Sequence, residues 1–458
     1  MNNPFIIDYR IWITALLSSG LGVLLITLSS FFDKKPLLLL AWPLSALFLI
    51  FMVIQPKWTA VLILFLRPLL DVLLNLTKVD VGGEGVGIGV ILNLMIILLA
   101  IFLAFYTLNF PQNVFPVYCW VFFLVFMLIT VSYSPVPRDG LRLLFNYLSY
   151  FAMFILPFLM IKNEDDFLFW IKILGLSFLL PIFCANIDML RGGHYFEDAG
   201  NRIMGTFTHP NILAFYLVLA FTFYFYILSA GFLDSKPLVT LIIKAILLDI
   251  LVLLVATKTR NAWVSVYAGF VIYGFLKDKK TLLFLIGMVP LLLIIPDVWQ
   301  RISNLWNGDT GNNYHGVNSL EWRIQLWQVS WTKILERPIQ GYGLASFQPS
   351  EEVFFPTAKG MHAHNAYLET LFETGIIGLM SFVALFLGPL YIFLRNMCLS
   401  VTKTQARIWA IMVGYIISYM LICSADNLSF YLAFNWYVWF FIGLMLVASY
   451  RHYSVCVN

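Results

Sequence analysis

Residues 430–450 read FYLAFNWYVWFFIGLMLVASY, a run without a single charged side chain. A helix needs roughly 20 apolar residues to cross the hydrocarbon core of a bilayer, so this segment is long enough to span one. The whole chain shares its character: of 458 residues, 61% are hydrophobic and 11% are charged, whereas soluble domains carry about 25% charged residues. The sequence therefore predicts an all-α, polytopic integral membrane protein and argues against nucleic-acid-binding proteins, soluble dinucleotide-binding enzymes and secreted disulfide scaffolds.

Apolar runs of spanning length recur along the chain, and we expect 12 to 14 of them to cross the membrane. The weakest are 59–76, which contains Arg67 and Asp71, and 262–276, which is short. We expect Arg67 and Asp71, four residues apart, to neutralise each other. The predicted organisation is N-terminal helices at 1–190, a core at 191–395 and C-terminal helices at 396–458. The candidate spans lie at about 11–32, 37–54, 59–76, 87–108, 114–133, 143–161, 168–189, 211–232, 238–257, 262–276, 281–296, 375–394, 406–424 and 430–450.

The long hydrophilic stretch, residues 297–374, is predicted to be a loop outside the membrane that contains amphipathic helices. Lysines at 277, 279 and 280 precede the span that enters it, and Arg395, Lys403 and Arg407 follow the span that leaves it. Because Lys and Arg in short loops favour the cytoplasm, the long loop should face outward. Alternation then places residues 134–142, 190–210 and 257–261 on the outer side as well.

This topology gives the outer side an excess of arginine, against the usual bias. Either the topology is inverted, or the outer face retains arginines because it binds an anion. The planar guanidinium matches phosphate oxygens, and the lysine clusters independently mark the inner side, so we favour anion binding. The arginines concerned are Arg138, Arg142, Arg191, Arg202, Arg260, Arg301, Arg323 and Arg337.

The densest group of polar residues runs from Gly360 to Gly378 and contains His362, His364 and Asn365. From Asn365 onward the periodicity predicts a helix, so His364 should lie at a helix start, where the helix dipole disfavours a charged imidazole. A neutral imidazole there can accept a proton from a hydroxyl. The alternative is an interfacial histidine that only bonds a neighbour.

Four further segments supply candidate anion contacts. Lys258 and Arg260 follow a very apolar span and form either a phosphate clamp or an ordinary snorkelling pair. Residues 319–336 predict an amphipathic helix on the membrane surface, and it carries Arg323, whose alternative role is an ion pair with Glu321 or Asp309. Arg202 and His209 belong to a segment whose His-Pro-Asn sequence also suits a helix start. Arg138 and Arg142, one helical turn apart, join this outer set.

The chain contains no Asp-x-Asp sequence, and its acidic cluster at 164–166 is predicted to be cytoplasmic. Metal-dependent transfer from a diphosphate donor usually needs a carboxylate-held divalent ion to neutralise the leaving group. We therefore expect no cofactor and no metal, and arginines in place of the ion.

These residues resemble the O-antigen ligase family, whose superfamily also contains O-antigen polymerases. The central match is His364-Asn365, nine residues, then Gly375-x-x-Gly378. Further matches, in order between about 200 and 385, are Gly205-Thr206-Phe207 with His209-Pro210-Asn211, Thr259-Arg260, Trp322-Arg323 and Pro338-x-x-Gly341-x-Gly343.

The resemblance implies a multi-pass glycosyltransferase of the membrane-embedded GT-C type in the bacterial inner membrane, with its active site facing the periplasm. Its donor would be an undecaprenyl-diphosphate-linked glycan. The acceptor would be lipid A-core for a ligase of lipopolysaccharide biosynthesis, or a second lipid-linked glycan for a polymerase. Arg260, Arg323 and His364 match the family's essential arginines and histidine. Apart from these glycans, the expected partners are membrane lipids, and no nucleic acid.

Two other classes of function stay open at this point. A transporter of glycolipids or small anions would place ionisable residues near the membrane midplane and show inverted repeats. An assembly partner without catalytic activity would need no single polar residue.

Overall fold

The computed structural model describes most of the chain from residue 41 onward, and every structural statement below refers to that part. The described residues are 41–72, 79–81, 84–86, 88–107, 111, 113–196, 200–232, 236–294, 296, 298–300, 303, 319–355, 360–451 and 455–456. The expected first span at 11–32, together with Arg301 and Asp309, lies outside them.

The fold is 81% helical, which confirms the all-α prediction. Two short antiparallel hairpins interrupt the helices: β1 (Val79–Val81) pairs with β2 (Glu84–Val86), and β3 (His194–Phe196) pairs with β4 (Gly200–Arg202). The helices are α2 (Ala41–Ile54), α3 (Pro56–Leu69), α5 (Ile88–Thr107), α6 (Phe115–Val131), α7 (Pro137–Met160), α8 (Glu164–Leu190), α9 (Pro210–Ser229), α10 (Pro237–Ala256), α11 (Arg260–Lys277), α12 (Lys279–Leu293), α14 (Ser319–Glu336), α15 (Phe347–Phe354), α16 (Ala366–Leu399), α17 (Lys403–Cys423), the 3-10 turn η3 (Leu428–Phe430) and α18 (Leu432–Tyr450).

Seven of the described helices are long and apolar enough to cross a membrane: α7, α8, α9, α10, α16, α17 and α18. Apolar stretches at 92–107 and 115–131, within α5 and α6, are shorter. Each of these corresponds to a span expected from the sequence. The chain is thus a polytopic membrane protein, and the total of 12 to 14 crossings stays a prediction.

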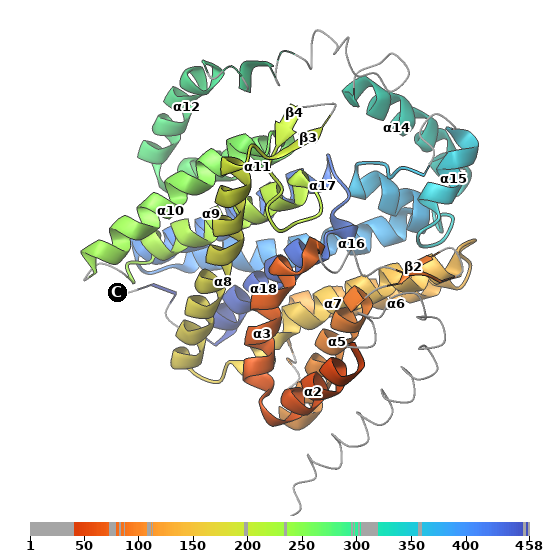
Figure 1. The fold of residues 1–458 in the computed structure, drawn as a ribbon, viewed down its shortest axis with the longest axis horizontal. Coiled ribbons are helices and arrows are strands. Elements are labelled where there is room, and N and C mark those ends of the chain that lie inside the picture. Colours follow the sequence, from red (N-terminus) through yellow and green to blue (C-terminus); the bar gives the residue numbers. More distant parts are fainter. Residues whose placement is uncertain are drawn as a thin grey trace, which may run out of the picture.

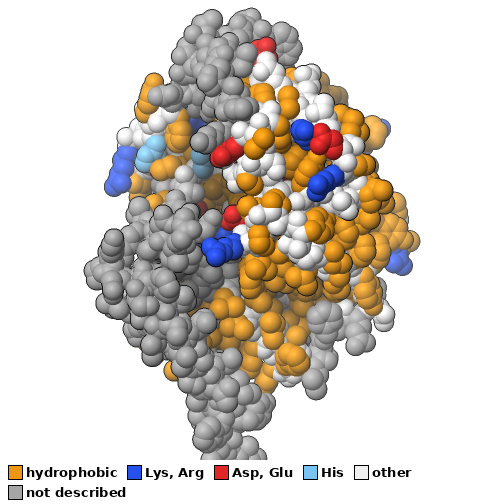
Figure 2. Space-filling view, turned by 90° about the vertical axis from the view of Figure 1, so that its right-hand side faces the viewer, with side chains coloured by type: hydrophobic (Ala, Val, Ile, Leu, Met, Phe, Trp, Pro, Cys, Tyr) orange, Lys and Arg blue, Asp and Glu red, His pale blue; other side chains and the backbone are white. Residues whose placement is uncertain are grey.

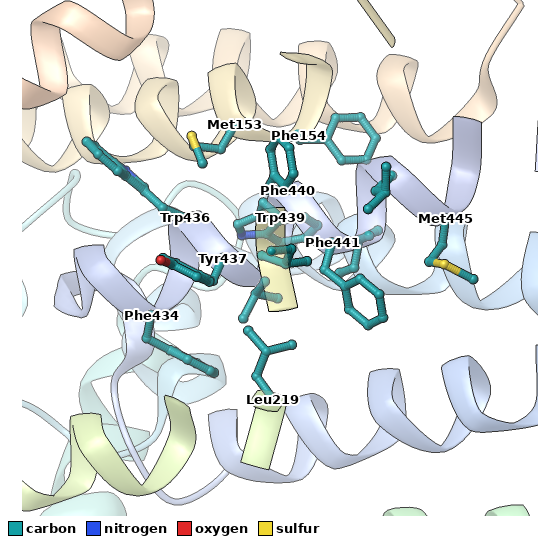
Figure 3. Close-up of a cluster of buried hydrophobic side chains, with 14 of the residues drawn as sticks. Met153, Phe154, Leu219, Phe434, Trp436, Tyr437, Trp439, Phe440, Phe441 and Met445 are labelled. Carbon is teal, nitrogen blue, oxygen red and sulfur yellow. The ribbon is translucent and has the colours of Figure 1, made fainter. Parts of the chain in front are cut away.

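The centre of the bundle is α18, which forms from the uncharged run at residues 430–450. It packs against α7, α9 and α16, so its aromatic side chains are buried on every side. Figure 3 shows these side chains of α18 beside Met153 and Phe154 of α7 and Leu219 of α9. Trp439 lies edge-on to Trp120, with ring centroids 4.6 Å apart. Since lipid is as apolar as these side chains, close packing rather than the hydrophobic effect holds such helices together.

The loops predicted to share the outer side do meet at one end of the bundle. Tyr133 Oη donates to Gln340 O at 2.6 Å, and Ser134 Oγ donates to Leu344 O at 2.7 Å. The loops before α9 and after α10 and α17 also contact one another there, as described below. The starts of α3 and α8 meet elsewhere, through the ion pair between Lys57 and Asp166 (2.9 Å). The loops predicted to lie on the outer side therefore share one end of the bundle, which we name the capped end, and the side of the membrane on which it lies stays a prediction.

The cap consists of α14, α15 and the start of α16, which Figure 1 shows together at the upper right. Its small apolar core is separate from that of the bundle and is formed by Trp322, Leu326, Ile334, Phe347, Ala363 and Phe372. The predicted amphipathic helix 319–336 is confirmed as α14, with Trp322 and Leu326 buried and Trp331 exposed.

A break in α16 fastens the cap to the bundle. Tyr342 N donates to Phe372 O, Gly343 N to Glu373 O, and Ile376 N to Pro338 O, at 2.8–3.1 Å. Gly375 has φ 65° and ψ −170°, a conformation open essentially to glycine alone. A Cβ at this position would lie 2.1 Å from the carbonyl oxygen of Ile339. The glycines of the matched motif thus let the two segments approach each other.

Candidate active site

A buried acid, Asp426, lies at the centre of the capped end. It belongs to the short polar segment between α17 and α18 and is only 3% exposed. Its carboxylate accepts hydrogen bonds from Asn211 Nδ2 (2.9 Å), Tyr431 Oη (3.0 Å) and Asn427 N (2.9 Å). No role for Asp426 was expected from the sequence, in which the available signal was an acid in the short gap between two apolar spans.

His364 lies beside this acid. Its Nδ1 is 3.8 Å from Asp426 Oδ1, an ion-pair distance, and none of the described residues gives this buried nitrogen a hydrogen bond. Its φ of 49° is in the left-handed region, which is uncommon for a residue other than glycine and often marks a functional position. Asn365 caps α16 by accepting from Tyr367 N and Leu368 N, both at 3.1 Å. The prediction that His364 precedes a helix start is therefore confirmed.

Arg323 approaches the same segment from α14. Its Nη1 donates to Ala425 O at 3.1 Å. Burial alone raises the pKa of the Asp426 carboxyl, but the nearby His364, the charge of Arg323 and the amide of Asn211 outweigh it, so the pKa is lowered. Asp426 is therefore an anion at neutral pH, held between a histidine and an arginine.

Arg202 reaches this group indirectly. It is 5% exposed, and its guanidinium donates to Thr257 O (2.8 Å), Asn211 Oδ1 (2.9 Å) and Thr259 Oγ1 (2.9 Å). The Asn211 amide then donates from its other atom to Asp426. Arg202 thus ties β4 to the ends of α10 and α9, and its contact with a substrate stays a prediction.

The other predicted cations differ in position. Lys258 and Arg260 flank Thr259, whose hydroxyl belongs to the Arg202 network, and Arg260 opens α11.

Arg138 and Arg142 are exposed at the start of α7, which reaches the Asp426 segment only further along its length. Two tyrosines of α7 contact this segment: Tyr147 Oη donates to Ser429 Oγ (2.9 Å), and Tyr150 Oη donates to Ser429 O (2.8 Å). His209 caps α9 by accepting from Asn211 N at 3.1 Å.

A neighbouring histidine also has a carboxylate partner. His362 Nδ1 lies 2.8 Å from Glu369 Oε1, and Glu369 Oε2 accepts from Ala363 N at 2.9 Å. The His362 ring rests on Phe430, with centroids 4.4 Å apart. No pattern in the sequence connects His362 with Glu369, seven residues further along the chain.

The surface at this side of the molecule is unevenly charged. Figure 2 shows hydrophobic side chains over its lower part, and most of the charged side chains and the histidines in its upper part, around a hollow. A membrane protein with a polar site at one end of its helices would have this distribution.

Comparison with known proteins supports the predicted relationship. Residues 245–383 match the family model of O-antigen ligases. A segment of 126 residues is 31% identical to the Rickettsia conorii protein named "Putative polysaccharide ligase RC0486"; the aligned part is 25% of this chain and 30% of that protein. The segment 245–383, which carries Arg260, Arg323 and His364, thus matches the O-antigen ligase family model, and the family resemblance seen in the sequence is confirmed.

Proposed function

We propose that the protein transfers a glycan from a lipid diphosphate to an acceptor hydroxyl, with the capped end as its active site. The observation that carries this proposal is the grouping of His364, Asp426 and Arg323 at that end. A base with a carboxylate partner and a nearby guanidinium are the groups that such a transfer needs.

His364 is the proposed general base. With its Nδ1–H directed at Asp426, the lone pair of Nε2 is available to accept a proton, and the carboxylate stabilises the imidazolium that forms. The 3.8 Å separation is longer than a hydrogen bond, as catalytic contacts often are without substrate.

The proposed step is one displacement. The acceptor hydroxyl loses its proton to His364, and its oxygen bonds to the anomeric carbon of the donor. The bond from that carbon to the diphosphate oxygen breaks, and its electron pair leaves with the diphosphate. Attack opposite the leaving group inverts the anomeric configuration.

Arg323 and Arg260 are proposed to stabilise the charge that develops on the diphosphate. Ala425 O uses one of the five donors of Arg323 and orients its guanidinium at the site. We expect the reaction to proceed without a metal ion.

A lipid A-core acceptor, and hence an O-antigen ligase, is our preferred assignment because the His364-Asn365 to Gly375-x-x-Gly378 spacing is intact. A polymerase would use the same donor with a second lipid-linked glycan. In either case we propose an inner-membrane location with the capped end in the periplasm.

A transporter is the other candidate, but the described ionisable residues favour it less. Arg67 and Asp71 pair with each other at 2.9 Å, as expected, and Asp71 also lies 3.4 Å from Thr208 N. The unpartnered nitrogen of His364 and the buried Asp426 lie where helices begin and end, not midway along them.

The test is reconstitution of the purified protein with an undecaprenyl-diphosphate-linked glycan, lipid A-core and a chelator. We expect the wild type to transfer glycan and His364→Ala to transfer none, when the two samples contain equal amounts of folded protein. Normal transfer by His364→Ala would refute the proposal. Glycolipid profiles of a deletion strain separate the two acceptors: a ligase loss leaves lipid-linked polymer behind, and a polymerase loss leaves single repeat units.

A further inference from the structure

The pair formed by His362 and Glu369 is not used in the mechanism above, although it lies within the same site. Glu369 is 4% exposed, and each of its oxygens has a partner, at 2.8 and 2.9 Å. His362 is less enclosed, with 27% of its side chain exposed. The Glu369 carboxylate therefore fixes the Nδ1 edge of the His362 ring, while another part of the ring is exposed.

The segment Ala425-Asp426-Asn427 places this pair beside the proposed catalytic groups. Ala425 O accepts from Arg323, Asp426 faces His364, and Asn427 Nδ2 is 3.5 Å from His362 Nδ1. Consecutive Cα atoms are 3.8 Å apart. One arginine and two histidines thus lie beside three consecutive residues.

The charges that face His362 come from two elements. Glu369 belongs to α16 and Asp426 to the segment between α17 and α18, while His364 and the cation Arg323 face Asp426. Burial by itself lowers the pKa of His362, but Glu369 and, more weakly, Asp426 raise it, and the net shift is upward. An imidazolium with Nδ1–H on Glu369 presents Nε2–H as a charged donor.

We propose that His362 is a further anion-binding residue, which contacts the diphosphate of the lipid-linked donor as an imidazolium held by Glu369. This inference rests on the proposed glycan transfer and adds a second role for histidine to it. His364 must be neutral to act as a base, whereas His362 must be charged to bind. Affinity for the diphosphate should therefore fall as the pH rises.

The test measures binding of undecaprenyl diphosphate to the full chain in nanodiscs between about pH 6 and pH 9. All variants are made in a His364→Gln background, so that the base does not contribute to the titration. We expect the affinity of this background to fall about tenfold as His362 loses its proton. Adding His362→Gln should weaken binding about tenfold at low pH and abolish the pH dependence. Adding Glu369→Gln should move the fall to lower pH.

Two further variants separate charge from structure. His362→Lys should keep the affinity and lose most of the pH dependence. His194→Gln is the matched control, because His194 also lies beside a carboxylate, Asp188 at 3.3 Å, but its side chain is 49% exposed on β3. The His194→Gln variant should change neither the affinity nor its pH dependence.

An unchanged pH profile in His362→Gln would overturn the inference. Equal loss of binding at every pH in both the Gln and Lys variants would also overturn it, since it would mark a purely structural residue. The proposed function fails separately: in that case the wild type transfers no glycan, and Arg323→Ala does not weaken binding of the probe.

Discussion

The most informative single change is Asp426→Asn, because it removes a charge and keeps the shape. The carboxylate is 3.8 Å from His364 Nδ1. At an effective dielectric constant of about 20, two unit charges at that separation attract by about 4 kcal/mol. This attraction appears only when His364 becomes an imidazolium, in the transition state. Its loss should therefore lower kcat by about 10³-fold, since each 1.36 kcal/mol is a factor of ten.

The assay is single-turnover glycan transfer from an undecaprenyl-diphosphate-linked donor by protein in nanodiscs. Asp249→Asn is the matched control: Asp249 accepts from Asn186 at 2.8 Å between α8 and α10, and both residues lie within these helices and not in the loop that carries Asp426. It should retain full activity per folded molecule. Thermal unfolding of each variant shows what fraction is folded.

The double variant tests whether the two residues act together. If Asp426 acts through His364, His364→Ala with Asp426→Asn should be no slower than His364→Ala alone. A kcat of Asp426→Asn within a few-fold of the wild type would refute the reasoning. Additive losses would refute the coupling between the two residues.

Three other changes have defined outcomes. Arg323→Ala should slow transfer, measured as an initial rate, by ~10²–10³-fold. Arg323→Lys should recover little of this rate because lysine lacks the planar fork of arginine. Arg395→Ala, on an exposed part of α16, is the control and should transfer at the normal rate. Gly375→Ala should destabilise the protein by roughly 1–3 kcal/mol or more, because the new methyl group would meet Ile339 O in a conformation open only to glycine. Gly287→Ala is the control, since a methyl group there would meet no described atom within 4 Å. Equal melting temperatures for the two variants would contradict this prediction. Burial raises the pKa of Glu351 to about 7, so its contribution to stability is complete below the unfolded value near 4.5 and is lost as the pH rises through about 7. Glu351→Gln should therefore flatten the fall in melting temperature between pH 5 and pH 8, and an unchanged fall would count against this assignment.

Much of the fold follows from the sequence because a bilayer leaves few choices. An apolar run of about 20 residues satisfies its backbone in lipid only as a helix, so α9, α10 and α18 lie where their runs predict. Local signals are as direct: Asn365 caps a helix from its side chain, and the periodicity of 319–336 gives α14. His364 was identifiable because polar side chains are costly in an apolar membrane protein, so a cluster of them indicates a function.

Contacts between distant segments were decided by the tertiary structure alone. Asp426 is 62 positions beyond His364, and no periodicity connects them. Their meeting depends on how α16, α17 and α18 pack, and that packing depends on the break at Gly375. The sequence therefore determined which elements form and which end of the bundle carries the polar groups. The packing decided which acid serves which histidine, because side-chain distances of a few ångströms depend on the positions of whole helices.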